Sequence, residues 1–307
     1  LPHLLNPEPG FFATTNECNV PQGYDHREAV GWNWADRYRV ERINEVLSSR
    51  DKHSLEQMMQ LQFDYTSLPA QSLVPRLAEL HSVDPLVESF RNRLLKWDFV
   101  IDKNSVEAAI YVTWERKLAS KLRMQVVPPE GQAYLRTLSL RKVLAWTTGE
   151  GGPLGNRAAR NQFLLAGLEE SVADLQKSLG GDTSTWKYGQ AKFHHVLIKH
   201  PLSNAVDSAT RAKLDLGPLP RSGYNATPGV TVGGNNQTTG ASFRMVTDLS
   251  DWDRAMFTNA PGQSGDSRSP YYGNLFVTWA DDVHFPIYFS RQKVEAVSRE
   301  KLTLRPE

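Results

Sequence analysis

Apolar residues recur at helical spacing from Asp36 into the middle of the chain, which predicts a largely helical region there. In the first of these stripes the apolar positions are Val40, Ile43 and either Val46 or Leu47. In a later one they are Leu168, Val172, Leu175 and Leu179. Apolar residues three or four positions apart lie on one face of a helix, so we expect both stripes to belong to the core.

Two local signals predict where individual helices begin. Ser54–Gln57 has the Ser-x-x-Gln spacing of a capping box, in which both side chains bond to backbone N–H groups of the first turn. Asp84 precedes Pro85, which suits a capping residue followed by proline at the first helical position. This second signal opens a helix expected over Leu86–Leu95.

Strands are expected at both ends of the chain. Gly10–Thr15 is predicted to form a short buried strand that follows a turn. The end of this strand is a candidate position for catalytic residues. In the last third, apolar and polar residues alternate, with the apolar side formed by Phe243, Met245 and Thr247 and later by Val283, Phe285, Ile287 and Phe289. The Gly-, Pro- and Asn-rich passage Gly217–Gly240 is expected to form loops.

This order of elements favours an α+β fold in which a helical insertion separates strands of one sheet. We expect residues 1–35 to supply a strand and a loop, residues 36–182 to form the mainly helical insertion, and residues 183–307 to return as strands.

Composition narrows the classes of function. The 307 residues are 40% hydrophobic and 22% charged, as in ordinary globular proteins, and 35 Lys and Arg against 34 Asp and Glu give a net charge of +1. Without a basic field, neither nucleic acid nor a membrane surface is an expected partner. The single cysteine, Cys18, excludes a disulfide within the chain. A chain that opens on Leu1 is expected to be a fragment processed or excised from a longer one.

Generic catalytic motifs do not match. Gly149–Gly155 lacks the Lys-Ser/Thr that completes a phosphate-binding loop. Gly262–Gly265 is one residue short of a Gly-x-Ser-x-Gly nucleophile elbow. The histidines His194, His195 and His200 lack the spacing of a zinc motif and are expected to be structural or surface residues.

Longer segments match the motifs of one enzyme family, in the same order. Asn6–Asn16 (NPEPGFFATTN) is similar to its Asn-Pro-x-x-Gly-x-x-Ala-x-x-Asn segment, and Tyr38–Ile43 (YRVERI) to its Tyr-Arg-x-Glu-Arg-Ile helix start. Further matches are Lys52–Gln57, Leu95–Asp98, Trp186–Gly189, His200–Leu202, Ala260–Gly265 and Phe289–Arg291. The family is that of the penicillin acylases, or penicillin amidases. The chain resembles the carboxy-terminal part of their β-subunit, with no matching motif across residues 125–182.

The resemblance implies an N-terminal-nucleophile hydrolase, with an αββα sandwich of which this chain carries a part. In such enzymes a precursor cuts itself to expose an N-terminal Ser, whose hydroxyl attacks an amide carbonyl while its own α-amino group acts as base. That nucleophile is expected on a segment upstream of Asn6–Asn16 and absent from this chain.

The same resemblance assigns roles to individual residues. Asn16 matches the asparagine whose side-chain amide contributes to the oxyanion hole. Arg42 matches an arginine that supports the active site, with Arg39 as the alternative and a helix-start ion pair as the competing explanation for Arg42. Asp25 lies nearest to the position of a calcium ligand in the family, so it is the candidate ligand for a structural calcium ion. The resemblance implies no cofactor that the chemistry requires.

The implied function is hydrolysis of the amide in a penicillin, a cephalosporin, an acyl homoserine lactone or a related N-acyl substrate. The expected partners are the α-subunit and the N-terminal part of the β-subunit of the same precursor, in the periplasm or outside the cell. The alternative is an inactive family member that serves as a binding or structural module.

Overall fold

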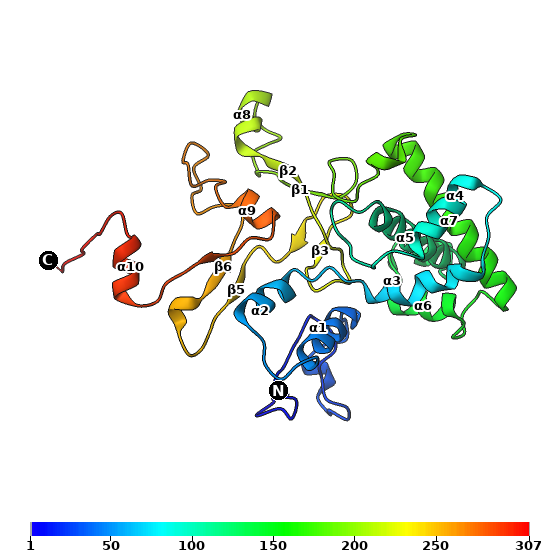
Figure 1. The fold of residues 1–307 in the computed structure, drawn as a ribbon, viewed down its shortest axis with the longest axis horizontal. Coiled ribbons are helices and arrows are strands. Elements are labelled where there is room, and N and C mark those ends of the chain that lie inside the picture. Colours follow the sequence, from blue (N-terminus) through cyan, green and yellow to red (C-terminus); the bar gives the residue numbers. More distant parts are fainter. Residues whose placement is uncertain (1, 307) are drawn as a thin grey trace. The chain divides into compact units, whose positions relative to one another are not determined.

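The computed structural model describes residues 2–306 and divides them into two compact units, each built from separate stretches of sequence (Figure 1). The first unit contains the residues up to Asp51 together with Asp64–Val196 and Pro218–Gly240. The second contains Lys52–Phe63, Leu197–Gly217 and the residues from Ala241 onward. Both units therefore combine residues from more than one of the three expected parts, whose assignment to core and insertion stays a prediction.

The first unit is mainly helical. Its α-helices are α1 (Tyr38–Ser48), α3 (Leu68–Leu73), α4 (Pro85–Leu94), α5 (Val106–Val126), α6 (Leu140–Thr148) and α7 (Arg157–Leu179). Its 3-10 helices are η1 (Arg27–Ala29), η2 (Val74–Glu79), η3 (Pro129–Gly131) and η4 (Thr183–Thr185). The strands β3 (Thr231–Val232) and β4 (Thr239–Gly240) of this unit pair antiparallel. The strands β1 (His195–Ile198) and β2 (Leu216–Pro220) form a two-stranded sheet, and each has residues in both units.

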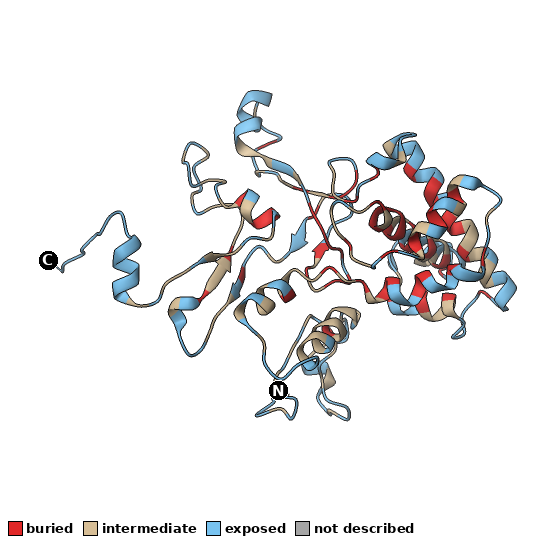
Figure 2. Ribbon diagram, viewed as in Figure 1, coloured by how far each residue is buried: buried red, intermediate tan, exposed pale blue. Residues whose placement is uncertain are grey.

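The core of this unit lies where α5 packs against α7. Figure 2 shows buried residues concentrated on α3 to α7. Trp114 of α5 is fully buried, and its indole Nε1 donates to the carbonyl oxygen of Leu164 on α7 at 3.0 Å. Gly167 lets the helices approach closely, because a Cβ at this position would lie 2.6 Å from the Leu118 side chain. Burial of this apolar surface is the main stabilising contribution to the unit.

The second unit holds a three-stranded antiparallel sheet with short helices. The sheet order is β5 (Arg244–Val246), β6 (Met256–Thr258) and β7 (Phe285–Pro286). The helical elements are α2 (Leu55–Gln62), α8 (Ser208–Leu214), η5 (Trp252–Arg254), α9 (Phe276–Ala280) and α10 (Arg291–Val297). No helix among residues 2–306 is both long and apolar enough to cross a bilayer.

The predicted helix starts are confirmed. In α2 the Ser54 side chain accepts from the backbone N–H of Gln57 while the Gln57 side chain accepts from that of Ser54. In α4 the Asp84 carboxylate accepts from the N–H groups of Leu86 and Val87. These signals are reliable because every bond involved joins residues within one helical turn.

Two strand predictions are wrong. Gly10–Thr15 forms no strand, and Phe12 is 60% exposed, because the only pairing of this region among residues 2–306 is a single bridge between Glu17 and Ala35. In β5 the alternation is reversed: Arg244 is 5% exposed, whereas Met245 is 45% exposed. The Arg244 guanidinium stacks on the Phe63 ring, 4.6 Å from its centroid, and this contact explains why an arginine faces inward.

Candidate active site

Asn16 lies at a sharp turn of the N-terminal segment. Its backbone is left-handed (φ 71°), a conformation that asparagine tolerates better than most residues. Its carbonyl oxygen accepts from the Ala35 N–H at 2.9 Å, which ties the turn to the segment leading into α1. The Asn16 side chain is exposed in the part of the chain that the structure describes.

Glu17 stiffens this turn. The residue is 3% exposed, and its carboxylate accepts from the backbone N–H of Thr15 at 2.6 Å and from the Thr15 hydroxyl at 3.0 Å. A buried carboxylate that bonds both groups of the residue before Asn16 restricts the rotation of that peptide. Sequence analysis did not select Glu17.

Arg39, in the first turn of α1, holds the Asn16 side chain. Its Nη2 donates to the Oδ1 of Asn16 at 3.0 Å and also to the carbonyl oxygen of Thr15. Since a guanidinium can only donate, this contact fixes which end of the amide faces the arginine, and the Nδ2 donor of Asn16 points elsewhere. Burial lowers the pKa of Arg39 from its ordinary value, and the charge of Glu17 opposes that shift.

Arg42 lies one turn further along α1 and makes different contacts. Its Nε donates to the Asp64 carboxylate at 2.8 Å, and its Nη1 lies 3.0 Å from the Glu45 carboxylate. These ion pairs give the Arg42 guanidinium a structural role. Of the two arginines considered from sequence, the structure brings Arg39, not Arg42, to Asn16.

Asp25 is exposed on the loop before η1. Among residues 2–306 no cluster of three or more His, Cys, Asp or Glu side chains could hold a metal ion. A calcium ion at Asp25 would therefore need backbone carbonyl, amide or water oxygens, or carboxylates of another segment, as further ligands. Calcium at this residue stays a prediction, and no catalytic step depends on it.

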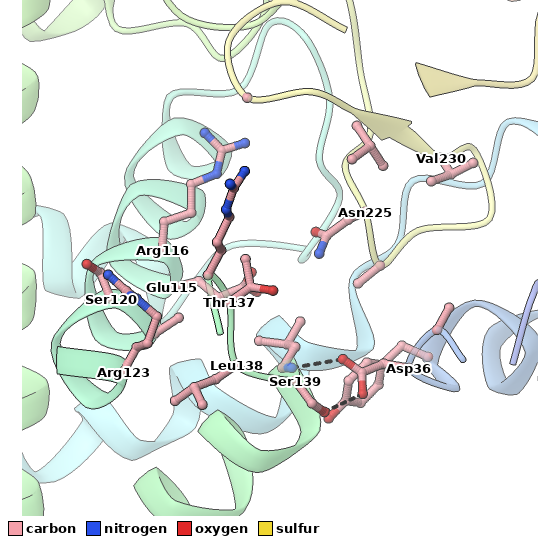
Figure 3. Close-up of a pocket in the computed structure, with 18 of the residues that line it drawn as sticks. Asp36, Glu115, Arg116, Ser120, Arg123, Thr137, Leu138, Ser139, Asn225 and Val230 are labelled. Atoms are coloured by element: carbon pink, nitrogen blue, oxygen red, sulfur yellow. Dashed lines mark hydrogen bonds between the residues drawn. The ribbon is translucent and has the colours of Figure 1, made fainter. Parts of the chain in front are cut away.

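A cavity of about 990 Å³ adjoins Arg39 (Figure 3). Its walls come from residues 33–39, from α5, from the loop that leads into α6, and from residues 225–234. Asp36 closes one side, because its carboxylate accepts from the Ser139 hydroxyl at 2.6 Å and from the Leu140 N–H at 2.8 Å. Asp36 thus caps the N-terminus of α6 from a distant part of the sequence and holds the wall in place.

The cavity is also bordered by a buried carboxyl group, Glu115 of α5. Its Oε2 accepts from the hydroxyls of Tyr111 at 2.6 Å and Tyr224 at 3.2 Å, and the Tyr224 hydroxyl lies 2.7 Å from that of Ser67. Burial raises the pKa of Glu115 to about 7, although hydrogen bonds from the two tyrosines oppose the shift. The signal for Glu115 in the sequence is an acid that directly follows the mainly apolar run in residues 108–114.

Stability should depend on the ionisation of Glu115. The pKa of Glu115 is about 7 in the folded state against an ordinary value of 4.5, so the folded protein binds this proton more tightly than the unfolded chain. Proton binding therefore stabilises the fold at low pH, and that stabilisation is lost as pH rises from about 4.5 through 7. The wild-type protein should lose on the order of 3 kcal/mol of unfolding free energy over this pH range. Glu115→Gln has no carboxyl group to ionise here and should not show that loss. Urea titrations of both proteins from pH 4.5 to 8 measure it; parallel curves would contradict the assignment.

Comparisons with known proteins agree on one family. The family model described as penicillin amidase matches residues 1–296. An acyl-homoserine lactone acylase, QuiP, of Pseudomonas syringae pv. tomato is 24% identical over 99% of this chain and 40% of its own length. Penicillin acylase 2 proenzyme of Pseudomonas sp. (strain SE83) is 25% identical over 98% of this chain and 40% of its own length. The chain therefore spans about 40% of these curated relatives.

A solved structure shows the same fold. Thermostable penicillin G acylase from Alcaligenes faecalis matches with a TM-score of 0.59 and 16% identity, over 98% of this chain and 58% of that one. The expected fold class is confirmed by this match: α+β, in part the N-terminal-nucleophile hydrolase fold.

Proposed function

Because this chain belongs to the penicillin amidase family, we propose that the complete protein hydrolyses an amide and releases the acyl group of an N-acyl substrate. The substrate classes to consider are penicillins, cephalosporins, acyl homoserine lactones and related N-acyl compounds. The curated relatives are named as acylases of two of these classes, which supports amide hydrolysis more firmly than any one substrate.

The observation that carries the proposal is the hydrogen bond from Arg39 to Asn16. Arg39 holds the amide oxygen, so the Nδ2 of Asn16 is an oriented donor that no described acceptor occupies. We assign this donor to the oxyanion hole, and we assign Arg39 the positioning role for which sequence analysis considered Arg42 first. A preoriented donor needs no reorganisation when negative charge develops on the substrate oxygen.

The chemistry proceeds in two steps. An N-terminal Ser, proposed to lie on a segment that these residues do not include, attacks the amide carbonyl, and its α-amino group takes the hydroxyl proton. The resulting oxyanion accepts a hydrogen bond from Asn16. The intermediate then expels the amine, which takes the proton, and water releases the acid from the acyl ester. The α-subunit and the N-terminal part of the β-subunit are the proposed partners, in a periplasmic or secreted enzyme made as a self-cleaving precursor.

An intact-mass measurement under denaturing conditions, with N-terminal sequencing of the natively purified protein, tests this proposal. We expect a companion fragment that begins with Ser, Thr or Cys, together with hydrolysis of at least one N-acyl substrate. A single 34.6 kDa species that begins at Leu1 and hydrolyses none would favour the alternative, a binding or structural module.

A further inference from the structure

Arginines dominate the charge of the cavity beside Arg39. Arg116 and Arg123 of α5 lie seven positions apart, two turns of one helix face, and both line the cavity. Ala119 and Ser120, which have small side chains, line the cavity between the two arginines, and Figure 3 labels Ser120 beside them. Arg136, on the loop that leads into α6, adds a further guanidinium to the wall.

The side chains of Arg116, Arg123 and Arg136 form no ion pair within residues 2–306. Arg123 donates to the carbonyl oxygens of Gln132 and Leu135, and Arg136 donates to that of Ala133, so neither forms an ion pair there. Among the same residues, the Arg116 side chain makes no hydrogen bond or ion pair. Guanidinium groups that face a cavity without a carboxylate are suited to bind one from a ligand.

The two acids that border the cavity, Asp36 and Glu115, offset only part of the charge of its four arginines, Arg39, Arg116, Arg123 and Arg136. Both carboxylate oxygens of Asp36 are occupied by the N-terminus of α6. Glu115 is 5% exposed and accepts from two tyrosines, and its pKa of about 7 leaves it only partly charged at neutral pH. On the opposite wall, Asn225 contributes a neutral amide rather than a competing acid (Figure 3). The cavity therefore keeps a net positive potential.

We propose that this cavity binds a carboxylate of the substrate, through Arg116 with Arg123 and Arg136, so that the enzyme prefers N-acyl substrates that carry a negative charge. This inference rests on the proposed amidase function. A volume of about 990 Å³ suits a small molecule rather than a polymer. Arg39 lines the cavity and also holds Asn16, so an anion bound here lies next to the proposed reaction centre.

Direct binding tests the cavity without requiring turnover. Titration calorimetry of the complete protein would compare glutarate with glutaramide, which has the same carbon chain and no charge. We expect glutarate alone to bind, and Arg116→Gln to weaken it about tenfold, as for the loss of one charge-assisted hydrogen bond. Lys117→Gln is the matched control, because Lys117 lies on the same helix but pairs with Asp174 at 2.6 Å. No glutarate binding, or equal binding by the Arg116 variant, overturns the proposal.

Hydrolysis assays then distinguish where the carboxylate lies. N-glutaryl anilide carries it on the acyl side, N-pentanoyl glycine on the amine side, and N-pentanoyl anilide carries none. Arg116→Gln should lower the kcat/KM ratio of one acidic substrate to the neutral one about tenfold, and Lys117→Gln should not. If both ratios stay unchanged while substrates are hydrolysed, the proposal fails. If nothing is hydrolysed, the amidase function fails, and glutarate binding still decides whether the cavity takes anions.

Discussion

Replacing Asn16 by alanine in the complete enzyme should lower kcat by about 100- to 1,000-fold, the usual cost of removing one oxyanion-hole donor. Its Nδ2 is the donor that Arg39 leaves directed away from itself. The effect should fall on kcat more than on KM, because the interaction strengthens only as charge develops on the substrate oxygen. Steady-state kinetics on any hydrolysed N-acyl substrate, with intact mass to verify self-cleavage, measures it.

The backbone of Asn16 calls for a second variant. Alanine at a left-handed position (φ 71°) costs about 1 kcal/mol of stability, whereas glycine adopts that conformation freely. Asn16→Gly should therefore melt closer to the wild type than Asn16→Ala and still lose activity. Asn19→Ala is the matched control, since Asn19 is an exposed asparagine of the same segment that bonds only Thr14 in the described chain. Full kcat in Asn16→Gly would sink the oxyanion assignment.

Arg39→Ala should lower kcat by about 10- to 100-fold, the range expected for a hydrogen bond to a charged group, with a smaller change in KM. Arg39 acts through Asn16, so the double variant with Asn16→Ala should be little worse than Asn16→Ala alone. Added guanidinium ion should restore part of the lost activity. Arg42→Ala should mainly lower the melting temperature, because Arg42 pairs with Asp64 and Glu45.

The reverse pattern would assign the supporting role to Arg42. That result is a loss of kcat in Arg42→Ala that is non-additive with Asn16→Ala, together with additive losses for Arg39→Ala. A purely structural role for Arg39 would instead show as a fall in melting temperature with no response to guanidinium ion.

The sequence predicted features whose interacting residues lie close together along the chain, and it failed where the partners lie far apart. The capping residues Ser54 and Asp84 were identified because their partners lie within one turn. The choice between Arg39 and Arg42 could not be made, because the two lie one turn apart on α1 and differ only in what the folded chain places opposite them. Arg42 meets Asp64, 22 residues away, and Arg39 meets Asn16 across 23 residues.

The strand errors have a related cause. Alternation in residues 243–247 indicated a face but not which face would be covered, and Arg244 turns inward because Phe63 offers its ring. Glu115 was missed because helical spacing marks apolar stripes and gives no weight to a single acid within one. Its neighbours Tyr111 and Tyr224 make that acid tolerable, and Tyr224 lies 109 residues away.

The first unit consists of three separate stretches of sequence, so a simple truncation cannot isolate it intact. The cavity draws on residues 33–39, on α5 and on residues 225–234, which are separated by stretches that belong to the other unit. A gene truncated before residue 218 would encode every helix from α1 to α7 yet leave Glu115 without Tyr224 and the cavity without one wall. On a ribosome, helices α1 to α7 are made before this wall, so the cavity is completed only once residues 225–234 have been added.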